Sequence, residues 1–420
     1  MKFHWFNLMP YPYLPDDFRQ KHRSVWVDVD SRLYDPIKGH RIYHDYLDLL
    51  EYAAELGFDG IGVNEHHANA YGLMPSPALM AATLARRTRD VSIVLLGMSI
   101  ALYNPPTRVA EEMAMLDVIS GGRLIAGFPV GTSMDTNYAF GANPATLRER
   151  YQENHDLIIR AWTDPDVFPW NGRFNKLRYV NIWPRPIQKP HPPIWIPGGG
   201  SIETWDFCAT RGYNYSYLSF SGFKRAAQLM NGFHDRVAEL GLPFNPYQAS
   251  FAQQIIVAET DAEAEESYFQ HAKYFFERCL HIYPGFADAP GYRTEATIRA
   301  GLKAQVAGVS SGGAVGKSYR QCVDEGFLVA GNPNHVTEQM EHLITSLRVG
   351  HVFCLLHIGD MPREKCEKST RLFAEHVMPR LRHLWQGYED HWSPKPLPGH
   401  LIAQPRPIPQ PRPNPQPIDA

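Results

Sequence analysis

The 420-residue sequence predicts an α/β fold, a closed (β/α)8 TIM barrel with insertions. Two observations support this prediction. Eight short apolar runs recur along the chain, and most of them are followed by a stretch with apolar residues at helical spacing. This alternation is typical of parallel strands joined by right-handed crossover helices. The chain is long enough to close such a sheet into a barrel, and a doubly wound open sheet is the competing arrangement.

The apolar runs place the strands, and the segments between them place the helices. The strands are expected at residues 2–8, 60–63, 91–98, 123–128, 192–198, 215–220, 253–259 and 352–357. The helices are expected at residues 43–58, 77–88, 107–120, 144–162 and 363–385. The first helix carries its apolar residues three and four apart and closes on Gly57, and the third ends at Gly121 and Gly122, which are helix-stop signals.

Three segments do not fit the alternating pattern and are expected to be additions to one barrel domain over residues 1–393. Residues 10–40 form a long polar and aromatic connection after the first strand. Residues near 280–330 have no clear period and are interpreted as a lid-like insertion. Residues 394–420 are rich in proline, so this tail is expected to be extended or disordered and to lie against a partner subunit.

Composition excludes several classes of protein. Apolar residues make up 44% of the chain, which predicts a globular fold, and a net charge of −3 without a long basic run speaks against nucleic-acid binding. The five cysteines are scattered and never spaced as CxxC, which argues against a disulfide framework or a cysteine zinc site. The sequence has no signal-peptide pattern and no membrane-spanning apolar run, so the cytoplasm is the expected location.

The motif Asn64-Glu65-His66-His67 follows the second predicted strand. In a barrel of this class, chemistry lies at the carboxyl ends of the strands. Successive strand residues point to opposite faces, so His66 and His67 are not expected to bind one metal ion together. One of these histidines is a reasonable group for proton transfer. A hydrogen-bonded pair of packing histidines and a metal-dependent hydrolase remain the alternatives.

Two glycine-rich segments resemble anion-binding loops. Gly198-Gly199-Gly200-Ser201 follows a predicted strand and precedes a helix, a context that favours a phosphate at the helix N-terminus, although an ordinary strand-to-helix turn also fits. The segment "SSGGAVGKSYR" lacks the first glycine of a nucleotide-binding P-loop, because Ser311 stands there. It is interpreted as part of the lid, from which Lys317 or Arg320 could reach a ligand.

Taken together, the segments "GFDGIGVNEHH", "NPPTRVAEEMAMLDVISGGRLIAGFPVG", "WPRPIQKPHPPIWIPGGGSIET" and "FAEHVMPRLR" resemble the bacterial luciferase-like, flavin-dependent monooxygenase superfamily. The resemblance covers roughly residues 1–270 and 330–385. It implies a barrel that binds FMN as FMNH2, supplied by a separate NAD(P)H-flavin reductase. Molecular oxygen then adds at the flavin C4a position, and the resulting peroxyflavin oxidises a small organic substrate. The family also implies a homo-oligomer, by default a dimer.

The resemblance assigns roles to individual residues. His66 matches the catalytic histidine, and the positions matched to cofactor binding are Asn64, Met98, Ser99, Tyr151, Gly199, Gly200 and Ser201. Met98 and Ser99 end the third strand, where the family often has a strained or cis peptide. The chain departs from luciferase after the fourth strand, because Pro129 and Val130 replace a reactive cysteine and a phosphate-binding arginine. This departure speaks against light emission and places more of the phosphate contact on the glycine loop.

Two further interpretations use the same barrel. The first is a deazaflavin-dependent oxidoreductase that transfers hydride without oxygen, and the second is a non-catalytic flavin-binding relative. Fold alone does not separate these functions. The sequence leaves the substrate open, as it does the choice between hydroxylation, Baeyer–Villiger insertion and C–S cleavage.

Overall fold

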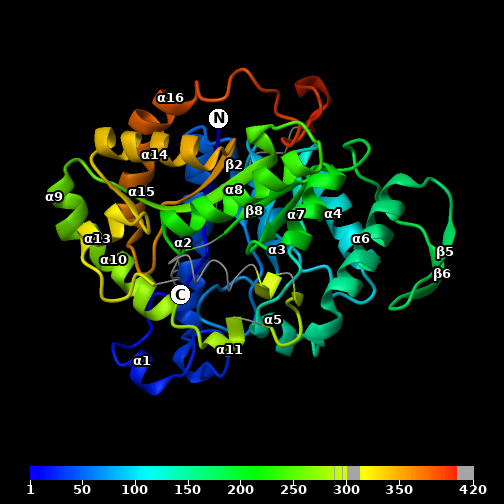
Figure 1. The fold of residues 1–420 in the computed structure, drawn as a ribbon, viewed down its shortest axis with the longest axis horizontal. Coiled ribbons are helices and arrows are strands. Elements are labelled where there is room, and N and C mark those ends of the chain that lie inside the picture. Colours follow the sequence, from blue (N-terminus) through cyan, green and yellow to red (C-terminus); the bar gives the residue numbers. More distant parts are fainter. Residues whose placement is uncertain (219, 288, 296, 300–312, 404–420) are drawn as a thin grey trace, which may run out of the picture.

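Eight parallel strands form a closed barrel in the computed structural model, which describes residues 1–403 apart from 219, 288, 296 and 300–312 (Figure 1). The strands are β1 (Lys2–Phe6), β2 (Gly60–Val63), β3 (Ser92–Leu95), β4 (Leu124–Gly127), β7 (Ile194–Gly198), β8 (Asn214–Tyr217), β9 (Ala249–Val257) and β11 (His351–Leu355). β8 pairs with β9, and β11 pairs with both β9 and β1, so the sheet closes. The predicted barrel is therefore confirmed, and the open sheet is not formed.

Helices connect successive strands on the outside of this barrel (Figure 1). The longer ones are α2 (Pro36–Glu55), α3 (Pro77–Arg87), α4 (Thr107–Ser120), α6 (Leu147–Thr163), α7 (Ile202–Arg211), α8 (Phe223–Glu239), α14 (Pro333–Leu347) and α15 (Arg363–Leu372). The helix expected at 43–58 begins seven residues earlier. The side chain of Asp35 accepts a hydrogen bond from the Ile37 amide at 2.8 Å, and Pro36 occupies the first helical position, so the helix starts there.

Several elements were not predicted from the sequence. β5 (Phe168–Asn171) and β6 (Lys176–Val180) form an antiparallel hairpin that projects from the barrel (Figure 1), and most of its side chains are not buried, so it lacks the apolar run of a core strand. β10 (Val329–Gly331) adds a short parallel strand beside β9. The short helices that were not predicted are α1 (Phe18–Lys21), α5 (Met134–Ala139), α9 (Asp261–Glu263), α10 (Phe269–Tyr274), α11 (Pro284–Ala287) and α13 (Tyr319–Asp324). A further short helix, α16 (Met378–Leu381), lies within the helix expected at 363–385.

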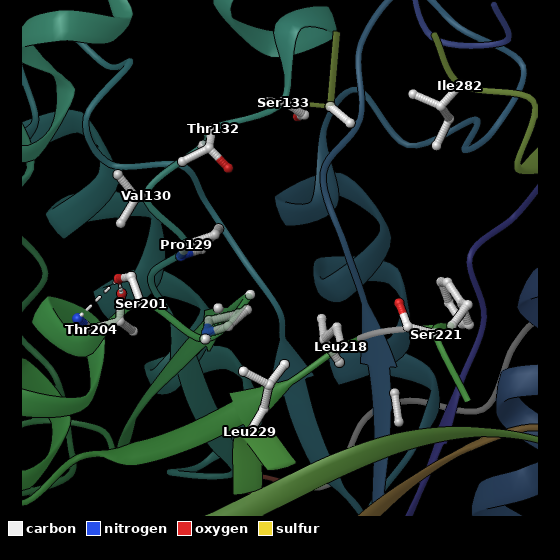
Figure 2. Close-up of a pocket in the computed structure, with 18 of the residues that line it drawn as sticks. Pro129, Val130, Thr132, Ser133, Ser201, Thr204, Leu218, Ser221, Leu229 and Ile282 are labelled. Carbon is white, nitrogen blue, oxygen red and sulfur yellow. Dashed lines mark hydrogen bonds between the residues drawn. The ribbon is translucent and has the colours of Figure 1, made fainter. Parts of the chain in front are cut away.

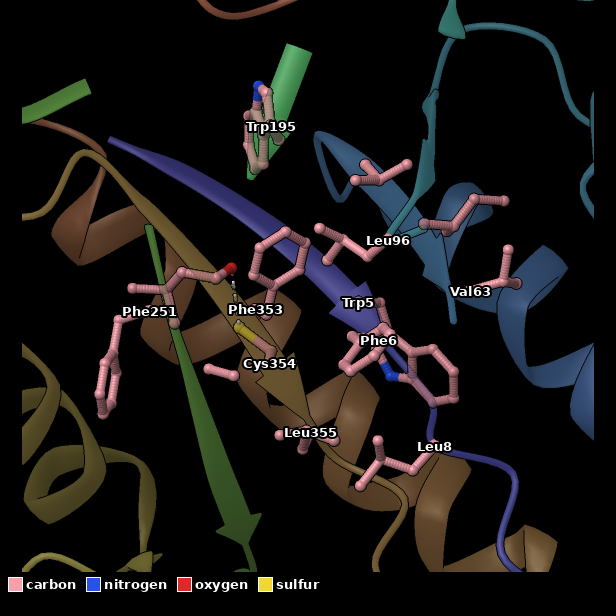
Figure 3. Packing of buried hydrophobic residues seen from close by; sticks show 14 of the residues in the cluster. Trp5, Phe6, Leu8, Val63, Leu96, Trp195, Phe251, Phe353, Cys354 and Leu355 are labelled. Carbon is pink, nitrogen blue, oxygen red and sulfur yellow. Dashed lines mark hydrogen bonds between the residues drawn. The ribbon is translucent and has the colours of Figure 1, made fainter. Parts of the chain in front are cut away.

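Aromatic rings fill the barrel interior (Figure 3). The ring centroids of Trp195 and Phe353 are 5.6 Å apart, and those of Phe6 and Phe353 are 5.7 Å apart, which is the range of favourable edge-to-face packing. The His4 ring also packs against Trp195 at 5.3 Å. Gly60 on β2 makes room for it, because a Cβ at that position would lie 2.2 Å from His4 Nδ1. The interior is therefore packed below the mouth of the barrel.

The C-terminal segment closes the floor of the barrel. Trp195 Nε1 donates to the Trp392 carbonyl at 2.9 Å, and the Leu397 amide donates to the Gly121 carbonyl at 2.8 Å. The first part of the proline-rich tail thus lies against its own chain. Residues 404–420 lie outside the described part, and the tail's expected extension and contact with a partner stay predictions.

The structure also bears on membrane-spanning helices and on the state of the cysteines. Within the described residues, no helix combines the length and the apolar character needed to cross a membrane. All five cysteines are buried and unpaired.

Candidate active site

A cavity of about 1050 Å³ opens at the carboxyl ends of the barrel strands. This is the end at which (β/α)8 enzymes carry out their chemistry. Its volume lies at the upper end of the range of roughly 300–1,000 Å³ common for small-molecule sites. Residues at the ends of six strands contribute to its lining, and they are Phe6, Asn64, Leu96, Pro129, Gly198 and Leu218. The cavity therefore has room for a large ligand, or for two ligands side by side.

His66 lies in the wall of this cavity and is held by one buried carboxylate. Its Nδ1 is 3.1 Å from Asp135 Oδ2, and the same oxygen accepts hydrogen bonds from Asn69 Nδ2 at 2.8 Å and the His67 amide at 3.4 Å. Asp135 comes from α5, which the sequence did not predict. Burial alone would raise the pKa of the Asp135 carboxyl, but the hydrogen bonds and charge from His66 and neighbouring donors hold this pKa below its usual value.

An ionised carboxylate only accepts hydrogen bonds, so it fixes the state of the His66 ring. Nδ1 carries a proton and donates a hydrogen bond to Asp135. Nε2 is therefore the nitrogen that can exchange a proton with a ligand. No hydrogen bond joins Nε2 to another residue in the described part of the chain. The His66 side chain keeps 15% of its surface exposed, and it lines the cavity. The pair has the arrangement of an oriented general acid–base group.

The neighbouring residues Glu65 and His67 serve a different purpose. The Glu65 carboxylate accepts hydrogen bonds from the Ser99 amide at 2.7 Å and the Tyr103 hydroxyl at 2.6 Å, and His67 Nε2 lies 3.0 Å from it. It thereby ties the end of β2 to the segment after β3. The rings of His66 and His67 contact different carboxylates. The described residues contain no group of three or more histidine, cysteine or acidic side chains that could hold a metal ion.

The opposite side of the cavity is formed by the Gly198–Ser201 turn and the start of α7. Ser201 caps α7: its Oγ accepts from the Thr204 amide at 3.2 Å and lies 2.8 Å from Thr204 Oγ1 (Figure 2). Gly200 has a φ of +95°, which favours glycine, and a Cβ on Gly199 would meet no atom within 4 Å. Backbone at this turn is therefore open to a ligand, next to the positive end of a ten-residue helix.

Arg148 is a cationic residue of this site that the sequence analysis missed. It lines the cavity, and its Nε and Nη2 are buried without a hydrogen-bond partner among the described residues. Nη2 lies 3.8 Å from Glu203 Oε2, at the start of α7, and the guanidinium lies 4.7 Å from the Tyr292 ring centroid. Arg148 lies in the first turn of α6, where a positive charge is unfavourable next to the positive helix end unless an anion is near. An arginine at this position in "TLRERY" is therefore a local signal that could have identified Arg148 from the sequence.

The structure brings most of the predicted site residues together. Those that line the cavity are Asn64, His66, Ser99, Gly199, Gly200 and Ser201. Met98 and Tyr151 do not reach the lining. Met98 is buried directly after a cis peptide between Leu96 and Gly97, and the Tyr151 hydroxyl donates to the Phe128 carbonyl at 2.8 Å. Burial raises the pKa of Tyr151 well above its usual value, so the hydroxyl stays protonated in that bond.

Described parts of the segment near 280–330 also face the cavity. Leu280, Ile282, Tyr292 and Thr297 belong to the lining. The segment is fastened to α7 by Glu203, whose carboxylate accepts hydrogen bonds from the Thr294 hydroxyl and, at 2.9 Å, from the Thr297 hydroxyl. Its opening and closing as a lid stays a prediction. Residues 310–312 of the P-loop-like stretch lie outside the described part of the chain.

Comparison with known proteins identifies relatives of this chain. The family model for luciferase-like monooxygenases matches residues 29–349. The chain is 34% identical over 343 residues to the 4-hydroxyprotoasukamycin monooxygenase of Streptomyces nodosus subsp. asukaensis. This match covers 80% of this chain and 85% of that protein. It is 28% identical over 219 residues to the oxygenase component of the flavin-dependent trigonelline monooxygenase of Acinetobacter baylyi, covering 50% of this chain and 58% of the relative. With the uncharacterized protein y4wF of Sinorhizobium fredii the match spans half of the relative's length.

Solved structures share the fold at low identity. The oxygenating constituent of 3,6-diketocamphane monooxygenase from Pseudomonas putida, solved in complex with FMN, has a TM-score of 0.67 at 18% identity over 90% of this chain and 98% of that one. An F420-dependent secondary alcohol dehydrogenase has a TM-score of 0.61 at 13% identity, with the same coverage of both chains. At these identities the similarity shows the barrel fold alone.

Proposed function

The chain belongs to the luciferase-like monooxygenase family. On that premise we propose that it is a flavin-dependent monooxygenase and the oxygenase component of a two-component system. In this proposal it takes FMNH2 from an NAD(P)H-dependent flavin reductase and inserts one atom of dioxygen into a small organic substrate. Two relatives support the two-component arrangement, since one is named an oxygenase component and the other an oxygenating constituent.

The lining residues fit a flavin mononucleotide. Asn64 is 4% exposed, lines the cavity, and its Oδ1 is buried without a partner in the described part of the protein, so it suits an N–H donor on a flat heterocycle. The unpartnered Nε and Nη2 of Arg148 suit phosphate oxygens. The open backbone at Gly199 admits the same group.

Phosphate binding rests on Arg148, the Gly199–Ser201 turn and Thr204. The guanidinium supplies a charge, the helix end supplies unpaired N–H groups, and the two hydroxyls at Ser201 and Thr204 supply further donors. In this proposal Arg148 supplies the positive charge toward the phosphate that luciferase obtains from an arginine at the position of Val130. When bound, FMNH2 supplies the electrons that activate dioxygen.

Proton control rests on His66. With Asp135 holding Nδ1, the ring presents Nε2 to the cavity and can deliver or remove one proton there. The apolar lining around it, including Phe6, Leu96 and Tyr71, keeps bulk water away from the reacting atoms. Asn64 and Ser99 lie at the ends of the adjacent strands and are the residues that we expect to position the flavin ring.

The observation that carries this proposal is Arg148, whose buried Nε and Nη2 have no hydrogen-bond partner among the described residues, in the same cavity as the oriented His66. Titration with FMN and with riboflavin, followed by flavin fluorescence, tests it. We expect Arg148→Gln to weaken FMN binding by about tenfold and to leave riboflavin binding unchanged, because only FMN carries the phosphate. Arg160→Gln is the matched control, since Arg160 pairs with Asp164 elsewhere on α6.

The oxygenase activity is tested by turnover with FMN, NADH and a flavin reductase under isotopically labelled dioxygen. One labelled oxygen atom per product molecule is the expected result. Oxygen-independent substrate oxidation with a deazaflavin would instead favour the hydride-transfer alternative, and an equal loss of riboflavin and FMN binding in Arg148→Gln would contradict the phosphate assignment.

A further inference from the structure

One side of the cavity, next to His66, is an apolar wall assembled from segments outside the barrel strands. We define this wall by the residues Trp26, Tyr71, Phe276, Leu280 and Ile282, all of which line the cavity. Backbone hydrogen bonds join its segments: the Val25 amide donates to the His281 carbonyl at 2.7 Å, and the Ala70 amide donates to the Val25 carbonyl at 3.4 Å. The wall is therefore a connected surface, and the insertion after β1 contributes its tryptophan.

Two rings of the wall, those of Trp26 and Tyr71, contact His66 and each other. Ring centroids are 4.7 Å apart for His66 and Tyr71, 6.2 Å for Trp26 and His66, and 5.8 Å for Trp26 and Tyr71. Rings this close leave no space for an ammonium group between their faces, as an aromatic cage for a cation requires. The surface suits a flat or cyclic carbon skeleton placed beside His66.

The wall itself carries no charged residue. In the part of the cavity that the structure describes, the charged or ionisable lining residues are Glu65, His66, Arg148, Arg225 and Arg293, and of these His66 contacts the wall through its ring. Both oxygens of Glu65 accept hydrogen bonds from within the protein. Arg148 lies beside Glu203 at the start of α7, the helix that Ser201 caps. Figure 2 shows Ser201 and Thr204 on one side of the cavity and Ile282 on the other.

Arg278 lies between Phe276 and Leu280 in sequence, but it does not neutralise an anion at the wall. Its Nη1 donates to the Leu14 carbonyl at 2.8 Å, and its Nη2 pairs with Asp16 at 2.6 Å. An ammonium group against the wall would therefore lose its hydration without gaining a carboxylate partner. A carboxylate would meet at most the neutral Trp26 Nε1–H, which has no hydrogen-bond partner in the described part of the chain and suits a single neutral acceptor.

We propose that the substrate is a neutral molecule with a flat or cyclic apolar skeleton, and that Trp26 and Ile282 select it by contact. This inference rests on the proposed function for the meaning of "substrate", but the binding surface itself is defined without the cofactor. Selection for a neutral skeleton follows from a wall that offers a large apolar contact and no counter-charge.

Calorimetric titration of the flavin-free protein with three bicyclic probes of matched size tests the proposal. The probes are 2-acetylnaphthalene, which is neutral, 2-naphthoate, which is an anion, and N-methylquinolinium, which is a cation. We expect the neutral probe to bind at least tenfold more tightly than either charged probe. Equal or tighter binding of the anion or of the cation would overturn the proposal.

Variants locate the binding to the wall. Trp26→Ala should weaken binding of the neutral probe by about tenfold, and Trp26→Phe should recover most of the loss. Trp183→Ala is the control, because Trp183 is 81% exposed and is not part of the lining. Ile282→Asp should reverse the preference in favour of N-methylquinolinium. Unchanged binding in both Trp26→Ala and Ile282→Asp, with melting temperatures near that of the wild type, would refute the assignment.

FMN binding and probe binding, measured on the same variants, distinguish a failure of this inference from a failure of the proposed function. FMN titration is performed on each variant without any probe. Normal FMN binding together with a preference for a charged probe refutes only the substrate class. Binding of the neutral probe at the wall together with absent FMN binding refutes only the cofactor assignment.

Discussion

Two histidine–carboxylate pairs lie at opposite ends of the barrel, and they use the same residue types for different purposes. At the mouth, His66 Nδ1 is 3.1 Å from Asp135 Oδ2. At the floor, His351 Nε2 is 3.6 Å from Asp390 Oδ1, and His351 Nδ1 is 3.1 Å from His4 Nε2. Both carboxylates keep a pKa below the usual value although burial acts in the opposite direction.

The difference between the pairs is what surrounds the histidine. The side chain of His66 is 15% exposed and lines the cavity, whereas that of His351 is 0% exposed and is enclosed by the rings of His4, Trp195 and Tyr247. A nitrogen that faces a cavity can exchange a proton with a ligand, and one enclosed by protein cannot. We therefore expect the mouth pair to govern activity and the floor pair to govern stability.

The largest expected effect comes from His66→Ala. Loss of a positioned acid–base group should reduce product formation by roughly 10²–10⁴-fold. FMN binding and the melting temperature should stay close to the wild-type values, because the side chain borders a cavity. Coupled turnover, flavin titration and calorimetry measure these three quantities. Product formation at the wild-type rate would remove His66 from the mechanism.

Asp390→Asn, at the floor of the barrel, should lower stability and leave activity unchanged. Removing one charge of a buried pair should lower the free energy of unfolding by about 3 kcal/mol, while turnover per folded molecule stays the same. Urea denaturation followed by circular dichroism measures the loss. Glu389→Gln is the control, since the Glu389 side chain is 80% exposed. A fall in turnover without a fall in stability would reverse the roles that we assign to the two ends.

Asp135→Asn sharpens the comparison at the mouth. The asparagine amide can donate to Nδ1, which would place the ring proton on Nε2 and leave the wrong nitrogen protonated. We expect turnover to fall by about tenfold or more with little change in FMN binding. Asp156→Asn serves as the control, because Asp156 pairs with His155 away from the cavity. Equal turnover in Asp135→Asn and the wild type would show that the carboxylate does not orient His66.

The smallest expected effect is a pH dependence at the floor. Burial lowers the pKa of His4 to about 3, whereas an unfolded histidine titrates near pH 6.5. Between these values the unfolded chain binds the additional proton, so acid favours unfolding. His4 alone should reduce the free energy of unfolding by up to about 1.4 kcal/mol per pH unit as the pH falls from 6.5 toward 3.

Urea denaturation at several pH values between 4 and 7 tests this slope. The variant His4→Gln should show a slope shallower than the wild type by about the same amount, because the titrating group is gone. His234 and His357, whose pKa values burial lowers to about 4, remain in both proteins and contribute equally. Identical slopes would mean that the floor takes up the His4 proton without unfolding.

Much of the barrel could be predicted from local patterns. The helix stop at Gly121 and the strand-to-helix turn at Gly198–Ser201 are signals within a few residues, and both lie where they were expected. The hairpin β5–β6 could not be predicted in this way, because its side chains are mostly exposed and carry no core pattern. Its pairing is a property of two strands and is not visible in either one.

The residues of the candidate site fall into the same two groups, those that local sequence identifies and those that only packing places. His66 was identified because it ends a strand, and strand ends converge at one rim in any parallel barrel. Asp135, Arg148 and Trp26 were missed, since each comes from a helix or insertion whose place over the rim depends on the packing of other segments. Tyr151 was matched to a cofactor contact by the family resemblance, whereas packing directs its hydroxyl to the Phe128 carbonyl.

The sequence by itself determined the alternation of strands and helices, the rim position of His66 and the anion-binding turn, because each depends on residues close together in the chain. Tertiary structure alone decided which carboxylate contacts His66, which cationic side chain lies near the start of α7, and which rings form the apolar wall. Those contacts join residues that are distant in sequence, and their geometry exists only after the barrel has closed.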